Sequence, residues 1–133
     1  MPRRRSADVP RARSGVYLRR AEELLKAADW GLEQRLANVG AVNAVQAGIS
    51  ATDAFLVHHL GQRSTGADHH EAMGLLAMVT GAGVREIGQH LQRILDRKSE
   101  VEYQDREVTL NDAKELTKHA RRLLVRVQSE LRS

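Results

Sequence analysis

Residues 110–131, LNDAKELTKHARRLLVRVQSEL, carry the clearest structural signal in this 133-residue chain. Their apolar side chains recur at intervals of three and four, the period of an amphipathic α-helix that buries one face. The members of this stripe are Leu110, Ala113, Leu116, Ala120, Leu124, Val127 and Leu131. Thr109, with Asp112 three residues later, is a capping signal just before the stripe. The sequence therefore predicts one long helix that packs by a single face.

The same period continues through the rest of the chain from Val16 onward, which contains no proline. It predicts four further helices, over residues 18–39, 41–60, 69–79 and 84–101. Gly40 is expected to break the chain after the first of them, Gly61 to end the second and Asp68 to cap the third. The second helix is apolar around most of its circumference and should lie in the middle. We therefore expect an all-α antiparallel bundle of four to five helices, with a clear break at residues 80–83.

The net charge of +4 comes from the start of the chain. Residues 1–14 hold five arginines and one aspartate, whereas residues 15–133 hold equal numbers of basic and acidic side chains. With two prolines and few apolar residues, we expect residues 1–14 to be a disordered basic tail ahead of a single helical domain over residues 15–133. Such a tail would add solubility or non-specific attraction to phosphates.

Composition excludes several classes of function. The chain has no cysteine, so disulfides, thiolate catalysis and cysteine-based zinc sites are excluded. Aromatic residues are only 3%, too few for a stacking platform for single-stranded nucleic acid. No apolar run is long enough for a membrane span, and the basic start lacks the apolar segment of a secretory signal. We expect a cytoplasmic protein with no cofactor and no membrane partner.

Four short motifs follow one another along the chain. They are NAVQAGISATDA at 43–54, DHHEA at 68–72, RKSEVEY at 97–103 and Thr109-x-x-Asp112-Ala113. In this order they resemble the HEPN superfamily, helical domains first described from higher eukaryotes and prokaryotes, and in particular its small stand-alone bacterial members. The resemblance covers residues 16–132 and implies a bundle of four to five helices that is usually a homodimer. Many relatives are metal-independent endoribonucleases of toxin–antitoxin and other conflict systems, and others are non-catalytic modules that bind nucleotides or RNA.

The resemblance also implies a catalytic signature, an arginine followed four to six residues later by a histidine near the end of a late helix. The arginine would bind the scissile phosphate, and the histidine would move a proton near neutral pH. Arg97 matches the first position, but residues 98–103 contain no histidine, and Glu102 or Tyr103 stands in its place. A tyrosine with a pKa of about 10 is a poor general base at neutral pH. Arg97, Glu102 and Tyr103 are thus the catalytic candidates, and they also form a polar cluster that suits a ligand.

Other histidines carry weaker signals. Arg63 precedes His69, and Arg85 precedes His90, by spacings that fit the same formula, but a chain so rich in arginine produces such matches by chance. Two pairs of adjacent histidines also occur. Neighbouring residues of a helix point about 100° apart, so neither pair can share one metal ion as residues four apart do. We expect no metal site.

A row of polar residues follows one side of the second helix. Its members, within an arc of about 80°, are Asn43, Gln46, Ser50 and Asp53. A buried carboxylate needs a charged partner, and Arg97 is the expected partner of Asp53, with His69 or His70 as rivals. The row is then either a contact between helices or protomers, or one wall of a polar cleft. In the second case Arg97, Tyr103, Asp53 and His69 would bind a ligand.

These observations leave three hypotheses for function. The missing histidine favours a non-catalytic module that binds RNA, a nucleotide or a cognate partner protein such as an antitoxin. The alternative is a metal-independent endoribonuclease that uses Arg97 with a substitute proton carrier. The third is a subunit of a larger assembly that docks on nucleic acid through its basic tail. We expect a C2 homodimer, because the apolar faces of the second and last helices exceed what so small a bundle hides.

Overall fold

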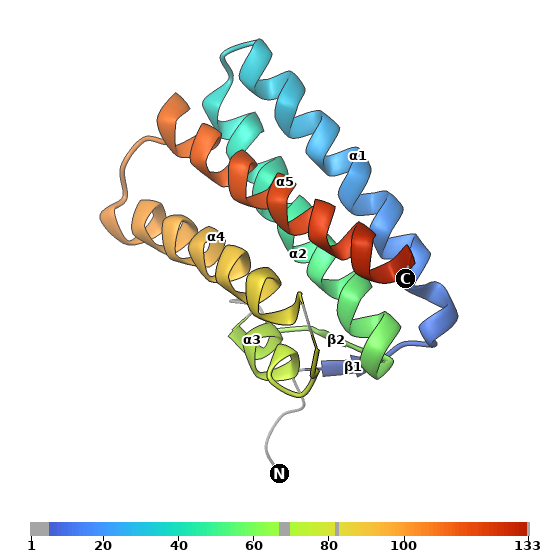
Figure 1. Ribbon diagram of the computed structural model, residues 1–133. Coiled ribbons are helices and arrows are strands. Elements are labelled where there is room, and N and C mark those ends of the chain that lie inside the picture. The colour runs from blue at the N-terminus through green and yellow to red at the C-terminus, as the bar shows by residue number, and fades with distance from the viewer. Residues whose placement is uncertain (1–5, 67–69, 82, 133) are drawn as a thin grey trace.

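The computed structural model describes residues 6–66, 70–81 and 83–132, which form a helical bundle with a small ribbon at one end (Figure 1). The elements are β1 (Ser6–Asp8), a 3₁₀ turn η1 (Arg11–Arg13), α1 (Ser14–Glu33), α2 (Ala37–Leu60), β2 (Gln62–Ser64), α3 (His70–Leu76), α4 (Val84–Gln104) and α5 (Leu110–Arg132). The expected all-α bundle is confirmed, with the two-stranded ribbon as an addition.

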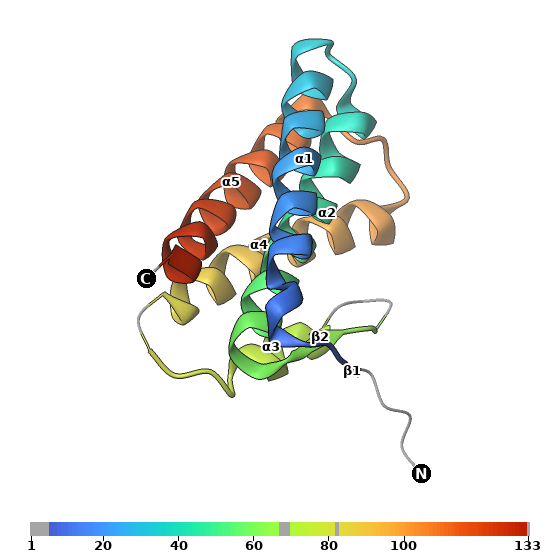
Figure 2. The same cartoon turned by 90° about the vertical axis from the view of Figure 1, so that its right-hand side faces the viewer.

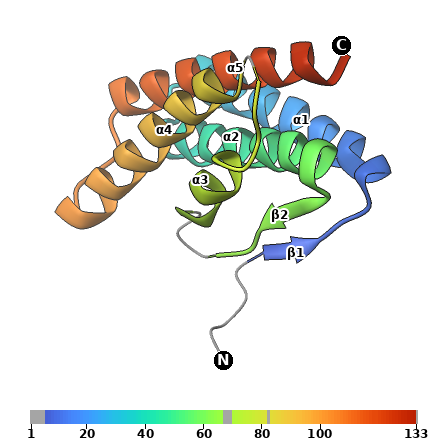
Figure 3. The same ribbon diagram turned by 60° about the horizontal axis from the view of Figure 1, so that its bottom comes forward.

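α2 lies in the middle of the bundle, where it contacts α1, α4 and α5. Figure 3 shows it between α5 on one side and the ribbon on the other. Every residue from Ala47 to Val57 is buried, which explains why this helix is apolar around most of its circumference. The predicted stripe of α5 is buried as well, at Ala113, Leu116, Ala120, Leu124 and Val127. The apolar faces that suggested a dimer are thus largely covered within one protomer.

The turn between α1 and α2 is centred on Arg35 rather than on Gly40, so the predicted break was misplaced. Arg35 has a left-handed φ of 58°. The backbone N–H of Leu36 donates to the Gly31 carbonyl at 2.8 Å, and that of Arg35 donates to the Leu32 carbonyl at 3.0 Å, as in a Schellman C-cap. An arginine therefore occupies the position that usually holds glycine. Gly40 lies inside α2 instead. A Cβ added to Gly31 would lie only 2.7 Å from the backbone nitrogen of Gly40, so α1 and α2 approach closely there.

Much of the segment expected to be a disordered tail has a defined structure. β1 pairs antiparallel with β2, with Ala7 opposite Arg63, and the N–H of Val9 donates to the Gly61 carbonyl at 2.8 Å. Gly61 ends α2 in the left-handed conformation, as predicted, and turns the chain into β2. The ribbon thus lies at the end of the bundle opposite the α1–α2 turn (Figure 2). The rest of the tail, residues 1–5, lies outside the described part.

Two helix boundaries differ modestly from the prediction. α3 is shorter than the expected 69–79, and its proposed cap Asp68 lies outside the described residues. α4 continues to Gln104 rather than ending near residue 101. Positive φ angles at Gly81 (126°) and Gly83 (90°) agree with the predicted break between these helices. Among the described helices, none is long and apolar enough to cross a membrane.

Candidate functional site

The residues singled out by the sequence do not converge on one site. Arg97 lies in α4 and contacts α5, whereas Asp53 lies in α2 near the ribbon. Tyr103 is 94% exposed. His69 and the side chain of Glu102 lie outside the described residues. The expected polar cleft is therefore two separate clusters, of which only one contains Arg97.

Arg97 pairs with carboxylates of α4 and α5 rather than with Asp53. Its Nη1 lies 3.4 Å from Asp112 Oδ1 and 3.8 Å from Glu100 Oε2. Arg106, from the loop between the two helices, makes the closer contacts to Asp112, at 2.7 Å from Nη1 to Oδ2 and 3.1 Å from Nη2 to Oδ1. Arg106 is thus the bidentate partner of the carboxylate, and Arg97 adds a longer contact.

Asp112 organises this cluster from a buried position. Its N–H donates to Thr109 Oγ1 at 3.0 Å, and its Oδ2 accepts from the Thr109 N–H at 2.9 Å, which confirms the predicted capping signal. The hydrogen bonds from Arg106 lower the pKa of Asp112, burial works against them, and the bonds to Thr109 lower the pKa further. The carboxylate therefore stays charged and fixes Arg97 at the seam between α4 and α5.

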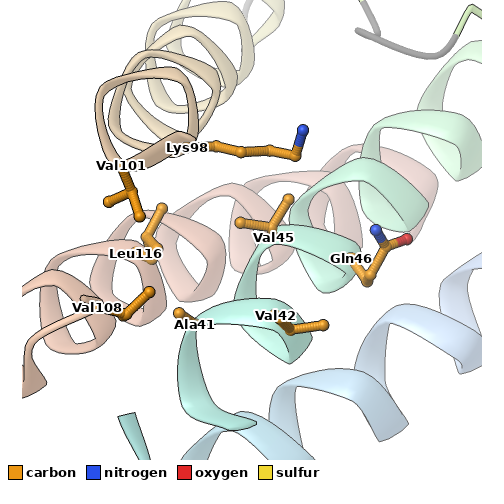
Figure 4. Close-up of a pocket in the computed structure, with 8 residues that line it drawn as sticks. All are labelled: Ala41, Val42, Val45, Gln46, Lys98, Val101, Val108 and Leu116. Carbon is orange, nitrogen blue, oxygen red and sulfur yellow. The ribbon is translucent and has the colours of Figure 1, made fainter. Parts of the chain in front are cut away.

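An apolar cavity of about 200 Å³ opens between α2, α4 and α5, next to this cluster (Figure 4). It is lined by Ala41, Val42, Val45, Gln46, Lys98, Val101, Val108 and Leu116. Lys98, the residue after Arg97, reaches from α4 toward α2 and lies above Val45 in this view. Apolar walls with one amide and one ammonium group suit a flat, partly polar ring.

Asp53 belongs to a second cluster, near the ribbon. It is 7% exposed, and burial raises its pKa to about 7 although Arg63 and Arg20 lower it. These two guanidinium groups lie 5.9 and 5.3 Å from the centroid of the Tyr17 ring. The charged neighbours of Asp53 thus come from β2 and α1, and the pairing expected with Arg97 was wrong.

The polar row of α2 is divided among different neighbours. Asn43 Nδ2 donates to the Val39 carbonyl of its own helix at 2.8 Å, and Ser50 Oγ donates to the Tyr17 carbonyl of α1 at 2.9 Å. Gln46 lines the cavity beside α4. The row therefore joins helices at one end and borders a cavity at the other, instead of forming one wall of a cleft.

A pair of histidines that the sequence reasoning missed lies between α4 and α5. Nδ1 of His90 is 3.0 Å from Nδ1 of His119. Each histidine follows a glutamate by four residues, and the Nε2 to Oε distances are 3.9 Å for both Glu86–His90 and Glu115–His119. The signal available in the sequence was this repeated Glu-x-x-x-His spacing. In each copy it places the glutamate and the histidine on the same face of their helix. Only the packing of the helices brings the two copies together.

These features define the protein as a helical bundle with polar clusters between its elements. The HEPN domain family model matches residues 15–130, which is nearly all of the bundle. The chain therefore belongs to the HEPN domain family, and the resemblance drawn from the four motifs is confirmed. No curated protein and no solved structure matches it.

Proposed function

We propose that the protein is a HEPN module that binds a nucleotide unit, either free or within an RNA chain, without cleaving it. The apolar cavity bordered by Lys98 carries this proposal. Its volume of about 200 Å³ is smaller than the roughly 300–1,000 Å³ of pockets for drug-sized ligands, so it suits a single base. Lys98, which lines the cavity from α4, supplies positive charge for the phosphate that accompanies the base.

The surroundings of Arg97 support binding without catalysis. Its guanidinium group already contacts Asp112 and Glu100. No histidine pairs with Arg97 within the described part of the chain, so the arginine–histidine pair of the ribonuclease signature is absent from that part. Of the two substitutes that the endoribonuclease alternative offers, Tyr103 is almost fully exposed, and the side chain of Glu102 lies outside the described residues. These features favour the binding module over the ribonuclease.

The proposal includes a homodimer, or a complex with a cognate antitoxin-like protein. Large apolar side chains remain exposed at the α1–α2 turn, namely Trp30 and Leu36. Exposed aromatic and aliphatic side chains of this kind are typical of the centre of protein interfaces. Sedimentation equilibrium at micromolar concentration should give twice the chain mass of 14.8 kDa, and a mass of one chain would contradict the dimer.

Isothermal titration calorimetry of the full chain with AMP, and separately with a short single-stranded RNA, tests the binding site. Val42 lines the cavity and is 60% exposed, so Val42→Trp should obstruct the cavity without disturbing the core. Val125 on α5 is 58% exposed and does not line this cavity, which makes Val125→Trp the matched control. We expect Val42→Trp to weaken binding at least about tenfold, or about 1.4 kcal/mol, and Val125→Trp to leave it unchanged.

The two ligands separate the sources of the nucleotide. Binding of AMP would identify the free nucleotide as sufficient, whereas binding of RNA alone would show that neighbouring phosphates are required. Failure of the wild-type protein to bind either ligand would overturn the proposal. Equal binding by Val42→Trp and the wild type would also overturn it, because the ligand would then lie elsewhere.

A further inference from the structure

The seam between α4 and α5 carries a symmetric arrangement of two histidines and two glutamates. The rings of His90 and His119 meet Nδ1 to Nδ1 at 3.0 Å, with their planes inclined by 43°. Their opposite nitrogens, both Nε2, face Glu86 and Glu115 at 3.9 Å, each on the same helix as its histidine. The order of groups across the seam is thus carboxylate, imidazole, imidazole, carboxylate. The nucleotide-binding proposal uses none of them.

This order favours the same tautomer for both rings. Each Nε2 lies 3.9 Å from its glutamate, which is too far for a hydrogen bond but close enough for the carboxylate charge to favour an N–H on that nitrogen. Two Nδ1 lone pairs then face the same gap at 3.0 Å, which is unfavourable unless they converge on a cation. A hydrogen bond between the rings would require one of them to give up the N–H that faces its glutamate.

We propose that His90 and His119 bind a divalent transition-metal ion, such as Zn²⁺, between their Nδ1 atoms. Imidazole suits zinc, copper and nickel. Two nitrogens that each lie about 2.0–2.1 Å from a zinc ion, at the tetrahedral angle, are about 3.3 Å apart, so the rings would separate by only a few tenths of an ångström. Glu86 and Glu115, which also pair with Arg126 and Lys118, lie 3.9 Å behind the two rings and can close to the outer position that carboxylates take behind metal-bound histidines.

The remaining coordination positions open toward solvent. A groove of about 600 Å³ runs along the seam, lined by the two histidines together with Gln92, Asp96 and other polar side chains. No group of three or more histidine, aspartate or glutamate residues is placed to hold a metal ion in the part of the chain that the structure describes. The chain therefore supplies two ligands, and water completes the shell. Arg93, Lys118 and Arg122 place positive charge near the pair, and Glu86 and Glu115 place negative charge there.

Calorimetric titration of Zn²⁺ into the metal-free full chain tests this site. We expect one saturable site per chain in the wild type. Glu115→Gln should weaken it about tenfold by removing an outer carboxylate, and His90→Gln or His119→Gln should weaken it more. The double variant His58→Gln/His59→Gln, which removes an adjacent pair elsewhere in the fold, is the matched control and should bind Zn²⁺ as the wild type does.

A second measurement avoids any change in the packing of the seam. Cu²⁺ added to the unaltered protein below one equivalent should broaden the NMR resonances of His90 and His119 before those of His58 and His59. The proposal is overturned if the wild type shows no saturable Zn²⁺ site, since the pair is then only a hydrogen bond. It is equally overturned if His90→Gln and His119→Gln bind Zn²⁺ as the wild type does, or if other histidines broaden first.

Discussion

Replacing Asp53 with asparagine should stabilise the protein at pH 8 and leave its stability nearly unchanged at pH 4. In the unfolded chain this carboxyl group ionises near its ordinary pKa of 3.8, whereas burial raises its pKa in the fold to about 7. Between these values the unfolded chain has released a proton that the native state still holds, so stability falls as the pH rises. At about 1.36 kcal/mol per pH unit, the loss above pH 7 approaches about 4 kcal/mol. Asparagine has no proton to lose and avoids this penalty.

Urea denaturation at pH 4, 6 and 8, followed by far-UV circular dichroism, measures the effect. The difference between Asp53→Asn and the wild type removes the contributions of other titrating groups, and it should grow steadily with pH. Glu23→Gln is the control, because Glu23 is an exposed carboxylate on α1 and its replacement should give a small difference without this trend. A difference for Asp53→Asn that does not grow between pH 4 and pH 8 would refute the assignment of a buried, proton-holding carboxyl group.

Three further predictions concern packing, the Asp112 cluster and the tail. Gly31→Ala should lower the free energy of unfolding by about 1–3 kcal/mol, because its Cβ would meet the α2 backbone. Gly15→Ala is the control, since there is open space around Gly15. Similar melting temperatures of the two variants would contradict the close approach of Gly31 to α2. Asp112→Ala should lower the free energy of unfolding by about 3 kcal/mol, since it strands two arginines and removes a cap, and Arg97→Ala by less than about 1 kcal/mol. Equal losses in urea denaturation would show that Arg97 is the main structural partner. Deletion of residues 1–5 should preserve the melting temperature and reduce the log–log salt dependence of the affinity for single-stranded RNA by about two, from the three arginines removed. An unchanged slope would assign the phosphate contacts to the bundle.

The helices were predictable because the apolar period survives wherever a helix packs by one face. The stripe of α5 and the broadly apolar α2 therefore led directly to the bundle. The turn between α1 and α2 was not predictable from local residue types, since Arg35 takes the left-handed position without a glycine to mark it. The ribbon was equally hidden, because strands of three residues joined by backbone hydrogen bonds leave no alternating pattern.

The candidate sites were predictable only where they are local in sequence. The bonds between Thr109 and Asp112 span three residues, and their pattern is visible in the chain. The contact of Arg97 with Asp112 depends on the geometry of the α4–α5 loop. The meeting of His90 and His119 depends on the rotation of two helices about their own axes, which residue spacing alone leaves open.

The most direct test of the central claim is one titration of a fluorescein-labelled single-stranded RNA with the wild-type protein in EDTA. Fluorescence anisotropy reports binding, and a denaturing gel of the same samples reports the length of the RNA. We predict a saturable rise in anisotropy with the RNA intact. Shortened products that disappear with Arg97→Ala would contradict this result and establish the protein as a ribonuclease.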